Sequence, residues 1–206
     1  MLLWLGLLLL AGGAACFAID RRAVHLIHDG IDLRTERLVH KTTDWAKGSH
    51  WLIVSVVAYA GAWAFAWKFG SNAHTELVRT AALAFVASLA AGSVILHATK
   101  ILLGRRRPRD ELDFGLYGFR PLGFDLTYDS FPSGHALTIF SVATILTGAL
   151  PWLALLWFAC AAYLSLTRVL LNSHFLSDVL VGAGVGILAT REVVLLWFPA
   201  LARGWF

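Results

Sequence analysis

Three short groups of polar residues interrupt an otherwise apolar chain, and each contains side chains that bind anions or transfer protons. The groups are Lys100 with Arg107-Pro108, then Pro132-Ser133-Gly134-His135, then Thr167-Arg168 with His174 and Asp178. Lysine and arginine bind phosphate, and histidine gains or loses a proton near neutral pH. These residue types therefore favour the binding of an anion beside groups that can attack it or protonate it.

The second group stands where a polar loop meets a strongly apolar segment, which predicts a helix that begins near Gly134. The first N–H groups of a helix have no partner within the helix, so they attract anions together with the positive end of the helix dipole. Pro132 and Ser133 are also ordinary residues for a helix start, and a well-capped helix is the structural alternative. His135 favours a functional interpretation, because an ionisable side chain at the head of an apolar span is energetically costly.

In the third group, His174 and Asp178 are four positions apart, which places one above the other on a helix face. We expect the carboxylate of Asp178 to accept the Nδ1–H of His174, which would fix the tautomer and raise the basicity of Nε2. The structural alternative is an acidic residue that only stabilises the start of a helix.

In the first group, Lys100 and Arg107 are seven positions apart, so a continuous helix would place them on one face. Gly104 and Pro108 predict that the helix loosens there, and the residue before a proline adopts an extended backbone. Arg107 would then point away from the helix axis. Alternatively, the basic residues between 100 and 109 form a cap whose side chains snorkel to lipid headgroups.

Together the three groups resemble the motifs of the type 2 phosphatidic acid phosphatase (PAP2) family, the membrane lipid phosphatases related to vanadium haloperoxidases. That family has a lysine and an Arg-Pro pair separated by six residues, then Pro-Ser-Gly-His, then Ser-Arg with a histidine after five residues and an aspartate after three more. Thr167 stands where serine is usual, and it keeps the hydroxyl. The motifs cover residues 100–178, and the predicted spans extend the resemblance over nearly the whole chain.

The resemblance implies a metal-independent site with three catalytic residues. His174 would attack phosphorus to form a phosphohistidine, Asp178 would orient His174, and His135 would protonate the leaving oxygen. The phosphate oxygens would be held by cations, a hydroxyl and a backbone N–H, supplied by Lys100, Arg107, Ser133, Gly134 and Arg168. The sequence near these residues has no acidic cluster suited to magnesium or calcium, so we expect neither a metal nor another cofactor.

The composition indicates that membrane helices position these groups. Hydrophobic residues make up 58% of the chain, charged residues make up 15%, and the mean hydropathy is +0.70. Six apolar segments approach the roughly 20 residues that a helix needs to cross a bilayer, near 1–19, 51–69, 78–102, 135–150, 152–171 and 176–198. They lack the alternation of barrel strands, so we predict an all-α integral membrane bundle of six transmembrane helices with a PAP2/haloperoxidase-like core. It would form one membrane domain over 1–206. We expect segment 1–19 to remain as an uncleaved helix, because no basic residue precedes its apolar run.

Two long connections stand out among the predicted spans. Residues 20–50 alternate charged and apolar side chains, which predicts an amphipathic segment at the membrane interface. Residues 103–134 are rich in glycine and aromatic residues, including Gly123 and Phe124, and we expect an active-site loop there. With 168–175 these connections share one face, and 13 of the 17 Lys and Arg residues lie on it or at 100–102, against 4 elsewhere.

That bias alone would place the face in the cytoplasm. Bacterial members of the PAP2 family work on the periplasmic face of the inner membrane, and surplus positive charge also suits anionic lipids. We therefore expect an active site in the inner membrane that faces the periplasm.

The expected function is a membrane lipid phosphatase that hydrolyses a phosphomonoester or pyrophosphate headgroup. The motifs suit phosphatidic acid, phosphatidylglycerophosphate, undecaprenyl pyrophosphate and lipid A phosphates equally. One alternative is a lipid phosphotransferase with the same intermediate. Another is a non-enzymatic binder or transporter of anionic lipids, which would not need two histidines and an aspartate. The expected partners are the lipid substrate and membrane lipids rather than nucleic acid, because headgroups explain the net charge of +4. The sequence makes no prediction of the oligomeric state.

Overall fold

A computed structural model describes residues 1–122 and 126–206, and this part of the chain is predominantly helical. Part of the predicted active-site loop, including Gly123 and Phe124, lies outside the described residues. The α-helices are α1 (Leu2–Cys16), α2 (Asp20–Gly30), α3 (Leu33–Thr43), α4 (Gly48–Phe69), α5 (Ala73–Leu103), α6 (Pro108–Phe114), α7 (Gly134–Ala149), α8 (Ala154–Leu170) and α9 (Leu176–Trp197). The predicted all-α class agrees with these elements.

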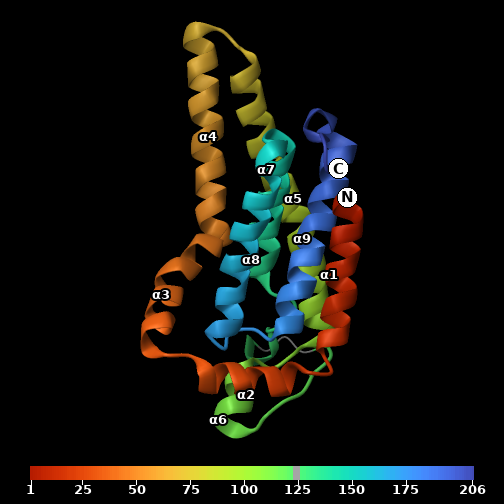
Figure 1. Cartoon of the computed structure of the whole chain (residues 1–206). Coiled ribbons are helices and arrows are strands. Elements are labelled where there is room, and N and C mark those ends of the chain that lie inside the picture. The colour runs from red at the N-terminus through yellow and green to blue at the C-terminus, as the bar shows by residue number, and fades with distance from the viewer. Residues whose placement is uncertain (123–125) are drawn as a thin grey trace.

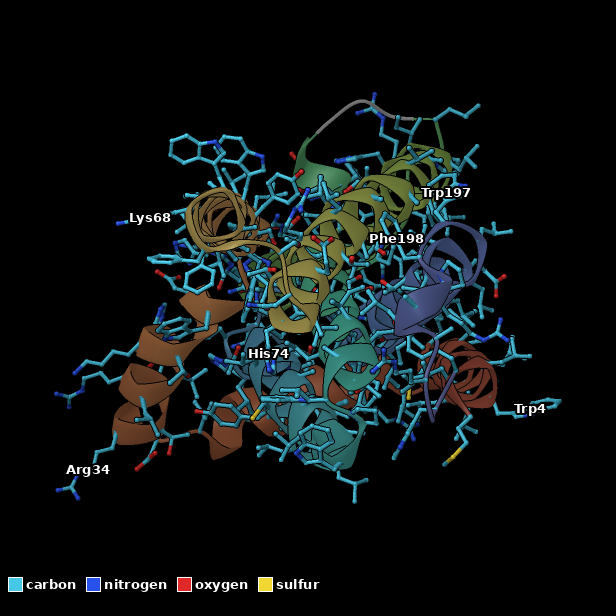
Figure 2. All side chains as sticks on the ribbon, turned by 90° about the horizontal axis from the view of Figure 1, so that it is seen from above. Trp4, Arg34, Lys68, His74, Trp197 and Phe198 are labelled. Atoms are coloured by element: carbon cyan, nitrogen blue, oxygen red, sulfur yellow. The ribbon has the colours of Figure 1, made fainter. Side chains whose placement is uncertain are left out.

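Helix α9 is the centre of the bundle and packs against α1, α5, α7 and α8 (Figure 1). Helix α4 packs mainly on α5 and extends beyond the other helices at one end. Helices α2 and α6 lie beneath the bundle at the opposite end in Figure 1, and α3 covers the side of α8 near that end. Viewed along the bundle, the side chains of Trp4, Arg34 and Lys68 point outward (Figure 2). The connections that carry the three motif groups therefore share the end covered by α2 and α6.

Four helical segments are long and apolar enough to cross a membrane: α4, α5, Pro151–Leu170 with α8, and α9. Helices α1 and α2 make a fifth candidate if they count as one span, and they meet at a bend of 87°. Helix α7 is apolar but has only 16 residues. All six predicted apolar segments fall on helices, but a count of six spans remains a prediction.

Glycines in α9 allow two neighbouring helices to approach its backbone closely. A Cβ added at Gly182 would lie 2.3 Å from the carbonyl oxygen of Ser133, and one at Gly184 would lie 2.9 Å from the carbonyl oxygen of Gly6. Real Cβ atoms do not approach backbone oxygens so closely, so only glycine permits this packing. The start of α7 is thereby held against α9, which sets the second motif group beside the third.

Residues 20–50 form two helices, where the sequence predicted a single amphipathic segment. Helices α2 and α3 are separated by Ile31 and Asp32, and a short 3-10 turn follows α3. The carboxylate of Asp32 accepts the N–H of Thr35 at 2.9 Å, which caps α3 and explains the break. Their location at the membrane interface remains a prediction.

Candidate active site

The end of α5 positions the first pair of cations. Gly104 adopts φ +51°, and a Cβ there would lie 2.3 Å from the carbonyl oxygen of Arg120, so both the turn and the close approach require glycine. Lys100 lies in the last turn of α5. Arg107 has the extended backbone predicted for a residue before proline (φ −81°, ψ 156°) and directly precedes α6. The chain thus turns between the two cations, as Gly104 and Pro108 predicted.

Lys100 and Arg107 converge on Asp129. Arg107 donates from Nε to Oδ1 at 2.8 Å and from Nη2 to Oδ2 at 3.0 Å, a bidentate pair. Lys100 Nζ donates to the Asp129 carbonyl oxygen at 2.5 Å and lies 3.7 Å from Oδ2. The Arg107 side chain is 33% exposed and that of Lys100 is 18% exposed. The structure therefore brings these two predicted residues together, accessible to solvent and in contact with an anionic group.

The second motif group joins the start of α7 to the start of α9. Ser133 is the N-cap of α7, and its Oγ accepts the N–H of Ala136 at 3.5 Å. The N–H of Ser133 donates to the carbonyl oxygen of Asp178 at 2.9 Å. Gly134 and His135 follow as half-buried residues in the first turn of α7. The capping interpretation of Ser133 therefore holds, and its role toward phosphate remains a prediction.

The third motif group lies at the end of α8 and in the short loop after it. The carbonyl oxygen of Arg168 accepts the N–H of Ser173 at 3.0 Å and that of His174 at 3.2 Å, which fixes the loop. Nη1 of Arg168 donates to Oγ1 of Thr43 at 3.0 Å, and Oγ1 of Thr167 donates to the same atom at 2.9 Å. The hydroxyl at 167 therefore helps to hold Arg168 against the end of α3.

His174 is buried, with 4% of its surface exposed. Its Nδ1 lies 2.8 Å from the carbonyl oxygen of Ser130. A carbonyl can only accept, so Nδ1 carries the hydrogen, and the lone pair of the neutral ring is on Nε2. The prediction that Asp178 accepts this hydrogen is wrong, because Oδ2 of Asp178 is 3.8 Å from Nδ1. The predicted tautomer nevertheless results, with a different acceptor.

Asp178 is occupied by three other donors, which explains the difference. Its carboxylate accepts from Ser130 Oγ at 2.6 Å, from the Phe175 N–H at 2.8 Å and from Arg105 Nη1 at 2.6 Å. The contact with Phe175 is a helix cap, so the structural alternative proposed for Asp178 is also realised. Ser130 bridges the pair, since its hydroxyl binds Asp178 and its carbonyl binds His174.

Burial keeps the His174 ring neutral. Burial lowers the pKa of His174, the carboxylate of Asp178 opposes this, and the charges of Arg168 and Arg107 lower the pKa further. The net direction is downward, so the ring is unprotonated at neutral pH, as a nucleophile requires.

A polar cavity of about 500 Å³ adjoins Arg168 and the loop before His174. Its lining comes from α2, α3, α6 and that loop, and includes Glu36, His40, Arg109, Asp113 and Asn172. Asp44 also lines it. The Lys47 hydrogen bond lowers the pKa of Asp44, as do nearby charges that include His135.

Sequence reasoning missed four residues of the site: Asp20, Arg105, Asp129 and Ser130. The alternative that treated Arg105 as one of a set of snorkelling side chains is wrong, because its side chain is fully buried. Arg105 is hidden in sequence by its basic neighbours, and Asp20 is 85 positions away from it. An aspartate at the end of a long apolar run was the one available signal.

The sequence profile of the PAP2 superfamily matches residues 81–202. Over 93 residues the chain is 32% identical to a lipid A 1-phosphatase of Rhizobium etli, covering 45% of this chain and 40% of that protein. Over 79 residues it is 39% identical to a lipid A 1-phosphatase of Porphyromonas gingivalis, covering 36% of this chain and 18% of that protein. The chain thus spans less than half the length of these relatives.

Two solved structures share the fold. The PAP2-type phosphatidylglycerolphosphate phosphatase of Bacillus subtilis aligns with a TM-score of 0.64 at 23% identity, covering 93% of this chain and 92% of that one. Aquifex aeolicus LpxE aligns with a TM-score of 0.62 at 21% identity, covering 86% of this chain and 95% of that one. The fold of membrane PAP2 proteins and the apolar helices together identify an integral membrane protein.

Proposed function

The chain belongs to the PAP2 superfamily, and on that premise we propose that it is a membrane phosphatase that hydrolyses a phosphate ester or pyrophosphate of a lipid. The observation that carries the proposal is the state of His174. Its ring is buried and neutral, and Nδ1 is bound to the Ser130 carbonyl, so the lone pair on Nε2 is available for attack.

In the first step, Nε2 of His174 attacks phosphorus, the N–P bond forms, and the P–O bond to the lipid breaks. His135 gives its proton to the leaving oxygen. In the second step, His135 takes a proton from water, the water oxygen attacks phosphorus, and the N–P bond breaks to release inorganic phosphate. Splitting the displacement in two lets one imidazole act as acid and then as base.

The nonbridging oxygens would be held by Lys100, Arg107 and Arg168, with the Ser133 hydroxyl and the N–H of Gly134 at the start of α7. Phosphoryl transfer depends mainly on positioning and on neutralising charge, which three cations around one group supply. Arg107 binds the carboxylate of Asp129 through two N–H groups, and the same bidentate geometry suits two phosphate oxygens. No step in this scheme is assigned to a metal.

We propose a glycolipid phosphate of the lipid A kind as the first substrate to test. Relatives named lipid A 1-phosphatase support this choice. The cavity of about 500 Å³ beside Arg168 supports it too, because its carboxylates, imidazoles and amide suit a hydroxylated headgroup larger than glycerol. The active face is proposed to lie in the periplasm, and labelling of cysteines introduced into α6 by a membrane-impermeant reagent tests that orientation.

The test is phosphate release by purified wild-type protein and His174→Ala from lipid A, phosphatidylglycerophosphate, phosphatidic acid and undecaprenyl pyrophosphate. We expect turnover by the wild type and a loss of roughly 10³-fold or more in His174→Ala. His74→Ala is the matched control, because His74 is exposed at the far end of α5 and should retain activity (Figure 2).

Wild-type turnover in His174→Ala would refute the assignment. Transfer of ³²P to a second lipid instead of water would make the protein a phosphotransferase. Headgroup binding without turnover, unaffected by removal of both histidines, would make it a lipid binder.

A further inference from the structure

A fully buried arginine links two parts of the chain that are far apart in sequence. The guanidinium of Arg105 donates from Nη1 to Oδ1 of Asp178 at 2.6 Å and from Nη2 to Oδ2 of Asp20 at 2.8 Å. All three side chains are 0% exposed. A buried charge is tolerated only with close partners of opposite charge. Arg105 therefore depends on both carboxylates, and each carboxylate depends on Arg105.

Aromatic rings pack against the guanidinium group of Arg105 and restrict its orientation. The Cζ of Arg105 lies 4.1 Å from the ring centroid of Phe175 and 4.6 Å from that of Phe17. Phe175 directly follows His174, and Phe17 lies in the bend between α1 and α2. The rings fix the direction in which the fork of N–H groups points, which suits arginine better than lysine.

Asp20 also binds the start of α9 directly. Its Oδ1 accepts the N–H of Ser177 at 3.1 Å, and its Oδ2 accepts the hydroxyl of Ser177. Ser177 is the second residue of α9, where backbone N–H groups have no partner within the helix. A residue from the start of α2 therefore caps the helix that carries Asp178.

A continuous set of contacts leads from Asp20 to the ring of His174. Arg105 connects Asp20 to Asp178, and Asp178 accepts the Ser130 hydroxyl at 2.6 Å. The Ser130 carbonyl then receives the Nδ1–H of His174 at 2.8 Å. Moving the start of α9 or the carboxylate of Asp178 would move the acceptor that orients the imidazole.

We propose that Asp20 is a positioning residue for the active centre, acting through Arg105 and Ser177 on the orientation of His174. The inference rests on the proposed function and extends it, because Asp20 lies outside the segment matched to the PAP2 superfamily, residues 81–202. The bend between α1 and α2 thereby belongs to the catalytic apparatus, although it contributes nothing that touches substrate.

The test compares Asp20→Asn with wild type, using the full chain in detergent micelles. The amide has nearly the same shape but cannot neutralise Arg105, so the start of α9 loses its anionic cap. We expect kcat to fall about 10- to 100-fold, as small displacements of a reacting group do. KM should stay within twofold, because Lys100 and Arg107 are untouched. Asp29→Asn, an exposed position on the same helix, is the control and should leave both constants unchanged.

A second readout does not depend on turnover. In ¹⁵N NMR of histidine-labelled protein, with His174 assigned through His174→Gln, the wild type should show the Nδ1–H tautomer. Asp20→Asn should show a mixture of tautomers. Ser177→Ala removes a single hydroxyl of the network and should show the same changes to a smaller degree, which covers the case in which Asp20→Asn fails to fold.

The two readouts separate the possible failures. A folded Asp20→Asn protein with unchanged kcat and an unchanged His174 tautomer would overturn the positioning role and leave the phosphatase proposal intact. An inactive wild type, with a His174 signal that still responds to Asp20→Asn, would overturn the phosphatase proposal alone. A fall in the kcat/KM of Asp20→Asn that arises entirely from a higher KM, with kcat unchanged, would also contradict the positioning role.

Discussion

Arg105 and Arg107 are two positions apart, and each is paired with carboxylate groups, yet their surroundings are opposite. Arg105 is 0% exposed and lies between Asp178 and Asp20. Arg107 is 33% exposed and is paired with Asp129, which is 25% exposed. One arginine is therefore enclosed by its partners, while the other is accessible to solvent.

The difference in burial gives the two ion pairs different roles. A buried pair has already lost its hydration, so removing one partner leaves an uncompensated charge at a cost of about 3–5 kcal/mol. A half-exposed pair contributes about 0–1 kcal/mol, and water or another anion can replace either partner. Arg105 is suited to fixing structure, and Arg107 is suited to exchanging a carboxylate for a phosphate.

The largest expected effect is on folding, and it tests the first half of the comparison. Arg105→Gln leaves Asp20 and Asp178 without their shared cation, so the free energy of unfolding should fall by about 3–5 kcal/mol. Arg107→Gln should lower it by no more than about 1 kcal/mol. Both values come from SDS titration in mixed micelles followed by circular dichroism. Equal losses in the two variants would contradict the distinction.

The second effect is on catalysis, where Arg107 should matter more than its exposure suggests. If Arg107 binds phosphate as proposed, Arg107→Ala removes two charge-assisted donors to the transferring phosphoryl group, so kcat/KM should fall by about 10²- to 10³-fold. The matched control is Arg106→Ala. Arg106 is the neighbouring residue in the sequence, and it pairs with Asp110 at 3.0 Å instead of Asp129. That control should retain activity within about threefold. Similar losses in both variants would mean that charge near the loop matters, and contact with phosphate does not.

The motif residues were predictable from the sequence, and the buried network around Arg105 was not. Lys100, Arg107, Ser133 and Arg168 were predicted because ligand-binding side chains recur in short motifs with fixed spacing. The structure places Lys100 and Arg107 together, and it places Ser133 against the start of α9. Which groups each residue binds in catalysis remains a prediction.

The buried network was not predictable in the same way. Its members are brought together by packing between helices, and no local pattern marks Asp20 as the partner of Arg105, 85 positions away. The acceptor for His174 was misassigned for the same reason. Helix spacing placed Asp178 near the ring, but the loop that supplies the Ser130 carbonyl could not be placed from sequence. The bend of 87° between α1 and α2, by contrast, falls where the predicted first span ends and the predicted interfacial segment begins.

A smaller effect should follow from removing the carboxylate that now occupies Arg107. In Asp129→Asn the competing negative charge is lost, so inorganic phosphate or vanadate should inhibit about three- to tenfold more tightly, a change of about 1 kcal/mol. Asp110→Asn is the control, because Asp110 pairs with Arg106 instead. Inhibition constants from a phosphate-release assay measure both. Weaker inhibition in Asp129→Asn would show that Asp129 orients Arg107 for phosphate and does not compete with it.

The smallest expected effect is on the pH dependence of kcat/KM, which tests whether Arg107 influences the protonation of His174. Burial lowers the pKa of His174, so the acidic limb of kcat/KM should lie below the ordinary histidine value of about 6.5, with activity lost as pH falls through the lowered pKa. The charge of Arg107 contributes to that lowering, so Arg107→Ala should move the limb upward. Arg106→Ala should leave it in place. Because every variant is assayed on the same lipid, titration of the substrate phosphate contributes equally to each profile. A limb that stays fixed in Arg107→Ala would mean that the charge of Arg107 does not influence the protonation of His174.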